Sequence, residues 1–227
     1  MPTIAERYRG PADVPRQVPV FPLRGAILLP RAALRLNVFE PRYLAMVDEA
    51  LAGARVLAIV QPAAPGEEES PPGKSEPLKR IGCIGRLSAY QELDDGRLLI
   101  TLTGIARCAF GEEIAGGKPY RLYAASCDAF ERDFTAGVGE REVDREKLLA
   151  TLKSYLQARQ LNADWSAILN SPNEPLINAL AIMCPYGPEE KQALLEAPDL
   201  KSRAEVLVAL AEMELAAAGG GPRTRLL

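Results

Sequence analysis

"RIGCIGRLSAYQELDDGRLLITLTGIARCAF", residues 80–110, has the clearest secondary-structure pattern in the sequence. Two long runs of strand-forming residues flank the dipeptide Asp95-Gly96, a preferred two-residue turn between antiparallel strands. This turn places Cys83 opposite Cys108. It also separates an apolar face from a mixed face, because side chains alternate along a strand. The stretch therefore predicts a long β-hairpin with the two cysteines as cross-strand neighbours.

Four further strands and one short helix are predicted in the first half of the chain. The runs at 17–23 and 32–40 are interrupted by prolines, which sheets tolerate at edges and bends. The run at 54–62 is almost wholly apolar and fits a strand buried on both faces. Residues 40–53 have one apolar face, a proline in the first turn and a glycine at the end, which together indicate a helix. The remaining strand is expected at 119–131.

The second half of the chain has the apolar spacing of helices, three or four residues. Asp144 is placed to cap a helix that runs to about Gln160. Three more helices follow, and the last ends at the glycines that begin at Gly219. The first of these helices is expected to be capped by Ser171 or Asn173, and the second to begin at Pro188. The third is expected to be capped by Asp199 or Ser202. Strands followed by helices indicate an α+β fold.

The composition argues against several classes of function. The 227 residues are 48% apolar and 25% charged, with a net charge of -3 and a pI near 5.3. This acidic balance disfavours nucleic-acid binding. The chain has no histidine, which excludes Ser-His-Asp and Cys-His catalysis, and no stretch indicates a nucleophile. No apolar run of about 18 residues and no apolar signal region is present, so we expect a cytoplasmic protein that does not enter membranes.

The four cysteines form no C-x-x-C pair, and the chain offers no histidine to complete a zinc site. We therefore expect buried, reduced thiols, no metal and no cofactor.

Gly73-Lys74-Ser75 has the last three letters of a phosphate-binding loop. A true loop of this kind has four residues between its two glycines, whereas Gly66 and Gly73 are separated by three glutamates, a serine and two prolines. The glutamates repel a triphosphate, and the prolines lack the amide donors that would hold it. We expect no ATP binding, and we expect residues 62–79 to form a solvated, mobile loop.

Three stretches in order resemble the amino-terminal substrate-binding domain of the Lon protease family. The first is "VPVFPLRGAILLPRAALRLNVFEPRYLAMV" (18–47), with its Pro-x-Phe-Pro-Leu opening and its Phe-Glu-x-Arg-Tyr motif. The second is the hairpin of 80–110, with Asp-Gly-Arg at its turn. The third is "EEKQALLEAPDLKSRAEVLVAL" (189–210).

The resemblance implies a β pseudo-barrel of the PUA-like kind followed by a C-terminal helical bundle. On this basis we divide the chain into an amino-terminal tail (1–16), a barrel-like part with one short helix (17–131), a helical part (132–218) and a loose tail (219–227). A Lon protease continues into an ATPase module and a proteolytic domain. This chain ends at Leu227 without either, so we expect a stand-alone substrate-binding domain.

The resemblance also implies a non-enzymatic protein-binding module, a candidate protease adaptor or regulator. Its expected partners are unfolded or partly unfolded proteins and peptides, with a protease as a further candidate. DNA is excluded and RNA is disfavoured. The alternative is an RNA-binding or small-ligand-binding PUA-like protein. We expect the peptide-binding surface near residues 21–43, next to the helical half. The candidate contacts are Phe21, Leu23, Arg24, Leu29, Phe39 and Arg42.

Several residues of these motifs also have purely structural interpretations. Gly82, Gly85 and Gly104 are interpreted as sites of close backbone packing in a curled sheet. Lys191 and Arg203 lie on predicted helices, where solvated positions are expected for charged side chains.

Overall fold

The computed structural model describes residues 4–63 and 76–219. The expected mobile loop falls largely on residues 64–75, which also contain Gly73-Lys74-Ser75, and these residues lie outside the described part of the chain. Within the described residues, no helix combines the length and the apolar character that a membrane span requires.

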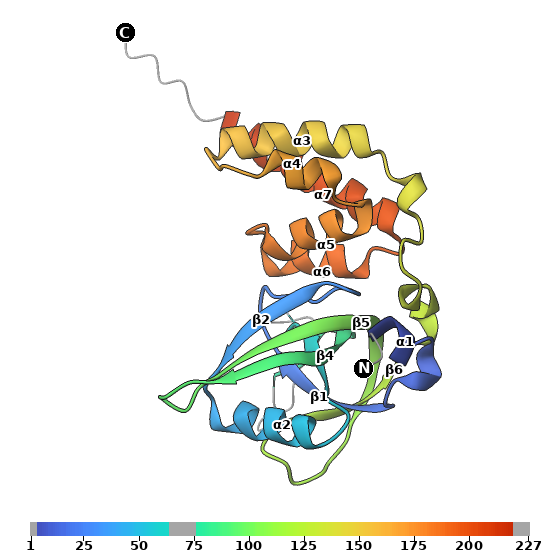
Figure 1. The fold of residues 1–227 in the computed structure, drawn as a ribbon, viewed down its shortest axis with the longest axis vertical. Coiled ribbons are helices and arrows are strands. Elements are labelled where there is room, and N and C mark those ends of the chain that lie inside the picture. Colours follow the sequence, from blue (N-terminus) through green and yellow to red (C-terminus); the bar gives the residue numbers. More distant parts are fainter. Residues whose placement is uncertain (1–3, 64–75, 220–227) are drawn as a thin grey trace.

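The described strands form one sheet that curls into a barrel (Figure 1). Their order is β2-β5-β4-β3-β1-β6, and an additional β5–β6 pairing closes the last five strands on themselves. Neighbouring strands are antiparallel except for β1 and β3, which are parallel. The strands are β1 (Gln17–Pro22), β2 (Ala33–Val38), β3 (Val56–Val60), β4 (Ile81–Glu92), β5 (Leu98–Glu113) and β6 (Leu122–Ser126). β2 is thereby left as an edge strand outside the closed barrel.

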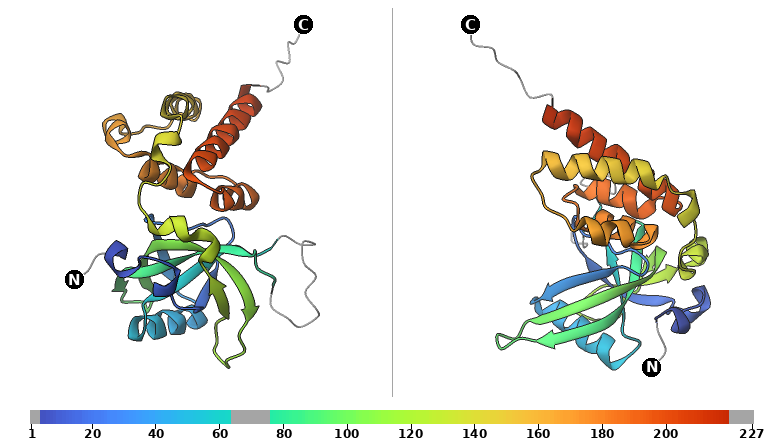
Figure 2. Two further views of the ribbon diagram at one scale, coloured as in Figure 1. Left: turned by 90° about the vertical axis from the view of Figure 1, so that its right-hand side faces the viewer. Right: turned by 45° about the horizontal axis from the view of Figure 1, so that its top comes forward.

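The helices of the second half of the chain form a second layer on one side of the barrel, and both further views show the same stacking (Figure 2). α2 (Pro41–Ala52) instead packs at the far end of the barrel (Figure 1). The other helices are α1 (Ile4–Arg7), α3 (Arg145–Ala158), α4 (Trp165–Asn170), α5 (Asn173–Met183), α6 (Pro188–Glu196) and α7 (Leu200–Gly219). Short 3-10 turns are η1 (Pro11–Asp13), η2 (Asp128–Phe134) and η3 (Glu140–Glu142). The expected α+β fold, with strands first and a helical region after them, is confirmed.

Side-chain caps explain several of the helix starts. The Asp144 carboxylate accepts a hydrogen bond from the Lys147 amide at 3.0 Å, and the Asp199 carboxylate accepts one from Ser202 at 2.8 Å. Both caps were among those predicted. The cap of α5 is neither Ser171 nor Asn173, because a side chain remote in sequence supplies it: Oε1 of Glu140 accepts from the Glu174 amide at 2.9 Å.

The central hairpin has a different register from the predicted one. The Leu93 amide donates to the Arg97 carbonyl and the Gly96 amide donates to the Leu93 carbonyl, each at 2.9 Å, which encloses a three-residue loop with Gly96 at φ 81°. Such a loop adds one residue to the two-residue turn we expected. Cys83 therefore pairs with Arg107, and Cys108 pairs with Gly82.

This one-residue difference sends the two cysteines to opposite faces of the sheet. Cys83 belongs to a core shared by β-strands, α2 and the helical half. Cys108 belongs to a second core, built mainly from the five strands that close the barrel. Both thiols are free and buried, as expected, but they are not cross-strand neighbours.

The predicted close packing at three glycines is confirmed. A Cβ atom on Gly104 would lie 2.0 Å from the Leu29 carbonyl oxygen, and one on Gly82 would lie 2.5 Å from the Ile59 oxygen. At Gly85 the nearest atom would be the Leu28 Cδ2, also at 2.5 Å. The curl of the sheet requires the absence of a side chain at these positions.

Buried cations join the helices of the second half to one another, which corrects the expectation that Lys191 and Arg203 are solvated. The Lys191 ammonium donates to the Ala181 and Ile182 carbonyls at 2.7 and 2.6 Å, near the end of α5. Burial lowers the pKa of Lys191. Arg203 donates to the Leu194 carbonyl at 2.9 Å, and burial, followed by the charge of Arg107, lowers its pKa to about 10. Both side chains act as internal hydrogen-bond donors to carbonyls that have no helical partner.

Replacing Lys191 with methionine is expected to lower the free energy of unfolding by about 1–2 kcal/mol, because two buried carbonyls lose their donor. Relief of the buried charge offsets part of this loss. Urea denaturation measures the effect, with Lys201→Met as the matched control on an exposed lysine of α7. Equal stability of the two variants would show that the Lys191 hydrogen bonds make no net contribution.

Candidate functional site

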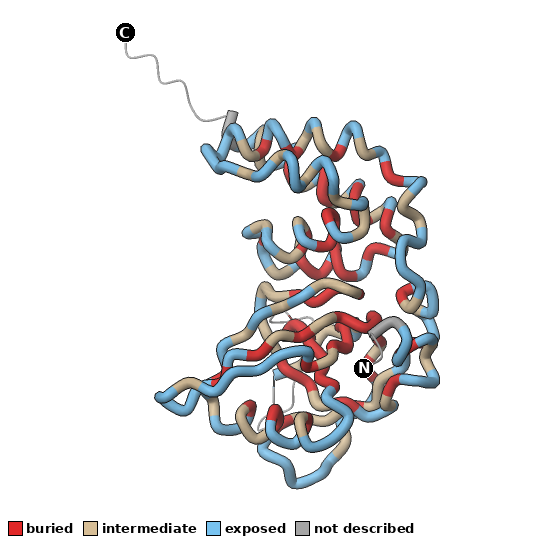
Figure 3. Tube along the Cα trace, in the orientation of Figure 1, coloured by how far each residue is buried: buried red, intermediate tan, exposed pale blue. Residues whose placement is uncertain are grey.

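β2 is the part of the sheet that offers an unused edge. It pairs with β5 on one side, from Ala33 opposite Thr103 to Val38 opposite Leu98, and no strand among the described residues pairs with its other side. Its residues alternate between exposed and partly buried up to Val38, as the tube in Figure 3 shows. A free edge of this kind can accept another strand.

An apolar groove begins where β2 starts and runs beside α5. Its volume is about 620 Å³, within the range of ligand and peptide sites. Small and apolar side chains form most of its lining, which is why the groove remains open between the two elements. These residues are Pro30, Ala32, Ala33, Ala136, Pro172, Pro175, Ala179, Ile182 and Met183. Met183, at the end of α5, is 77% exposed, so the groove presents a large flexible apolar side chain to a partner.

A polar cluster fixes one end of the groove. Arg31 has a left-handed backbone, with φ 63°, and its guanidinium bonds to the Glu174 carboxylate and the Asp133 carbonyl. Oε2 of Glu174 also accepts from the Gly137 amide at 2.9 Å. Asn178 donates to the Pro30 carbonyl at 3.1 Å. These bonds hold the start of β2 against α5 and so set the width of the groove.

The six candidate contacts predicted from the sequence fall in three environments, and none of them lines this groove. Phe21 and Leu29 are core residues, and the Phe21 ring stacks on Tyr43 with centroids 4.1 Å apart. Leu23 is half-buried. The exposed candidates are Phe39, which is 64% exposed, Arg24, whose side chain lies 3.8 Å from Glu76, and Arg42, which pairs with Glu40 and lies over the Tyr43 ring.

Phe39 and Arg42 follow β2 at the end opposite the groove. The edge strand therefore has exposed apolar side chains near both of its ends: Met183 at one and Phe39 at the other. The groove could not be identified from the sequence, because its residues come from three separate segments: 30–33, 136–140 and 172–183. The sequence features that point to the groove are the prolines at 172 and 175 and the methionine at the end of an apolar helix.

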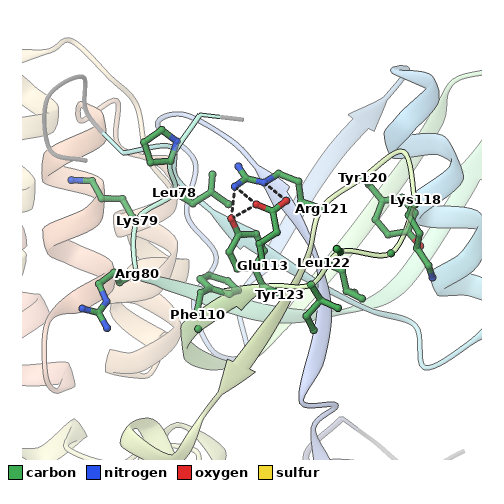
Figure 4. Close-up of a pocket in the computed structure, with 16 residues that line it drawn as sticks. Leu78, Lys79, Arg80, Phe110, Glu113, Lys118, Tyr120, Arg121, Leu122 and Tyr123 are labelled. Carbon is green, nitrogen blue, oxygen red and sulfur yellow. Dashed lines mark hydrogen bonds and ion pairs between the residues drawn. The ribbon is translucent and has the colours of Figure 1, made fainter. Parts of the chain in front are cut away.

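A second and larger pocket, of about 860 Å³, lies between residues 77–80 and the β5–β6 connection (Figure 4). Arg121 donates to both oxygens of Glu113, at 3.0 and 2.7 Å, and the Tyr123 hydroxyl donates to Glu113 at 3.0 Å. Burial raises the pKa of Tyr123 to about 12. These polar groups bond mainly to one another. The pocket therefore has fewer groups available to contact a ligand than the groove beside β2 has.

The three buried thiols have the properties of core residues and not those of nucleophiles, whereas Cys184 is only partly buried. Burial raises the pKa of Cys83 and of Cys108 well above the ordinary thiol value, and it raises the pKa of Cys127 to about 12. A thiol with a raised pKa is a poor nucleophile and metal ligand. In residues 4–63 and 76–219, no group of three or more histidine, cysteine, aspartate or glutamate side chains is placed to hold a metal ion.

Known protein families and relatives match most of this chain. Residues 17–212 match the model of the ATP-dependent protease La (LON) substrate-binding domain. A Lon protease of Desulfosudis oleivorans is 26% identical over 211 residues, covering 89% of this chain and 25% of that protein. Lon protease 2 of Myxococcus xanthus is 27% identical over 205 residues, covering 87% and 24%. The chain thus spans about a quarter of the length of these curated relatives.

Solved structures show the same fold. The Lon N-terminal domain protein from Xanthomonas campestris superposes with a TM-score of 0.59 at 20% identity, covering 85% of this chain and 97% of that one. The N-terminal domain of a Mycobacterium avium complex Lon protease gives the same TM-score and identity, with coverages of 86% and 98%. Because the family model covers residues 17–212, the chain belongs to the family of the Lon substrate-binding domain.

Proposed function

We propose that this chain is a non-enzymatic module that binds unfolded or partly unfolded protein segments in the groove between β2 and α5. The observation that carries the proposal is the position of an apolar groove at the free edge of a strand. Such an edge offers backbone hydrogen bonds, and the groove offers a place for an apolar side chain. Folded proteins keep most of their backbone hydrogen-bonding groups and apolar side chains in the interior, whereas unfolded chains expose both to a partner.

The family supports a role connected with proteolysis. The relatives are named as Lon proteases, and we infer that this chain presents protein segments to a protease as an adaptor or regulates access to one. We place it in the cytoplasm. The barrel part (17–131) and the helical part (132–218) are the two proposed units of the module, and the groove lies where they meet.

The absence of catalysis is also part of the proposal. The raised pKa values of the buried thiols and the lack of histidine support it. The acidic pI near 5.3 supports protein rather than nucleic acid as the partner.

Met183→Glu is expected to weaken binding of an unfolded protein at least about tenfold, since it places a charge at an apolar contact. Fluorescence anisotropy with labelled, reduced and carboxymethylated α-lactalbumin measures the affinity. Met213→Glu is the matched control, because Met213 is 68% exposed on α7 and does not line the groove. Circular dichroism verifies that both variants are folded.

Equal affinities of the wild type and of a folded Met183→Glu variant would remove the groove as the binding surface. Binding of single-stranded RNA with a steep salt dependence, and no binding of the unfolded protein, would instead favour the RNA-binding alternative.

A further inference from the structure

The backbone of β2 alternates between groups that face β5 and groups that face outward. The Ala32 carbonyl accepts from the Gly104 amide at 2.9 Å, so residue 32 faces β5. In an antiparallel pair this orientation repeats every second residue. Residues 34, 36 and 38 therefore face β5, and the amides and carbonyls of Ala33, Arg35 and Asn37 face the free edge. Within the described residues, no strand covers that edge.

Arg35 gives this edge an uncommitted positive charge. It lies in the middle of β2, it is exposed, and its cross-strand neighbour on β5 is the neutral Thr101. It forms no ion pair with any described residue. The arginines on either side of it along the chain are already paired, Arg31 with Glu174 and Arg42 with Glu40. A partner that lies along β2 thus meets one cation whose charge no described residue neutralises.

We propose that the groove is occupied by an extended protein segment that adds a strand to the free edge of β2, with an acidic side chain beside Arg35 and an apolar side chain two residues away in the groove. This inference rests on the proposed function and names the class of segment that the site selects. The outward amides and carbonyls require a partner that has a peptide backbone. The charge of Arg35 selects a carboxylate at one position of that backbone.

The spacing of the two contacts follows from strand geometry. Residues two apart in a strand are about 6.6 Å apart and point to the same face. Ala33 lines the groove and Arg35 is two positions along. A bound strand in register with β2 therefore places its side chain opposite Ala33 at the groove when the side chain two positions away is opposite Arg35. The proposal therefore specifies the side chains of the bound segment at these two positions alone.

The first test uses the intact chain and the acetylated, amidated peptide Ser-Leu-Thr-Glu-Thr-Leu-Ser. Its palindromic sequence presents the same pattern in both strand directions. Two N-methylated forms are compared, one methylated at Leu, Glu and Leu and the other at the two Thr residues. In a strand added to β2, one alternating set of amides faces β2 and the other faces solvent. One form is therefore expected to lose measurable binding, and the other is expected to keep an affinity within about threefold of the parent.

The second test exchanges the charges. The wild type is expected to bind the Glu peptide about tenfold more tightly than the same peptide with Lys at that position, and Arg35→Glu is expected to reverse the preference. Arg16→Glu, an exposed arginine just before β1, is the matched control and is expected to keep the wild-type preference. Folding of each variant is verified by circular dichroism.

Strand addition would be overturned if both methylated peptides lost affinity equally. Selection of an acidic side chain would be overturned if a folded Arg35→Glu variant still preferred the Glu peptide to the Lys peptide. Failure of the peptide to bind to a chain that binds unfolded α-lactalbumin would overturn both. In each of these cases an effect of Met183→Glu on α-lactalbumin binding would leave the proposed function standing, so the two failures are distinguishable.

Discussion

Asp133→Ala is expected to lower the free energy of unfolding by about 3–5 kcal/mol, the usual cost of removing one partner of a buried ion pair. Nε and Nη2 of Arg107 each lie 2.8 Å from an oxygen of Asp133, and the two side chains are only 4% and 9% exposed. Without the carboxylate, the guanidinium would keep its carbonyl partners at the end of α6 and on the loop after it, but no counter-charge. Because Arg107 is on β5 and that loop belongs to the helical half, the substitution loosens the junction between the two parts.

Chemical denaturation monitored by circular dichroism measures this loss. Asp128→Ala is the control, since Asp128 lies on the same 3-10 segment but is exposed. The double variant Arg107→Met with Asp133→Leu removes both charges and is expected to recover part of the stability. A cost below about 1 kcal/mol for Asp133→Ala would contradict the conclusion that this buried ion pair stabilises the junction between barrel and helices.

Gly104→Ala is expected to lower the free energy of unfolding by about 3 kcal/mol, at the upper end of the usual cost of overpacking. The new methyl group would lie 2.0 Å from the Leu29 carbonyl oxygen and 3.2 Å from the Pro30 Cα, so residues 29–31 must move away from β5. This movement also displaces Arg31 and widens the groove. We therefore expect binding of unfolded α-lactalbumin to weaken in the fraction that remains folded.

Gly111→Ala is the matched control on the same strand, because its nearest contact would be an ordinary 3.6 Å from the Ala124 Cβ. Thermal and urea denaturation of both variants give the comparison. Similar stabilities of the two variants would mean that the 29–31 segment is not held against β5 as closely as the structure indicates.

The parts of the fold that depend on neighbouring residues were predictable from the sequence. The caps at Asp144 and Asp199 use amides three residues away, so the local pattern contains all the information. The hairpin turn was harder, because Asp94-Asp95-Gly96 suits both a two-residue and a three-residue loop. Both place glycine at a left-handed position, and only the packing of the two long strands decides between them. The short helix α4 was missed, since six residues are too few to show an apolar period.

The site depends on contacts between distant segments, which a single sequence does not reveal. Phe21 and Phe39 are equivalent as apolar residues near strand ends, yet one stacks on Tyr43 and the other is exposed. Lys191 and Arg203 were expected on the surface because charged residues usually lie there. Their burial follows from the unpaired carbonyls of α5 and α6, whose positions are set by tertiary packing.

Hydrogen–deuterium exchange of the intact chain, with and without saturating unfolded α-lactalbumin, shows directly which surface of the protein the unfolded segment covers. If a protein segment binds in the groove and along the free edge, the amides of Ala33, Arg35 and Asn37 and those of α5 (Asn173–Met183) gain protection, whereas α3 and the β5–β6 connection exchange as before. Protection confined to other elements, under conditions where the unfolded protein is bound, would show that the segment does not bind in the groove or along β2.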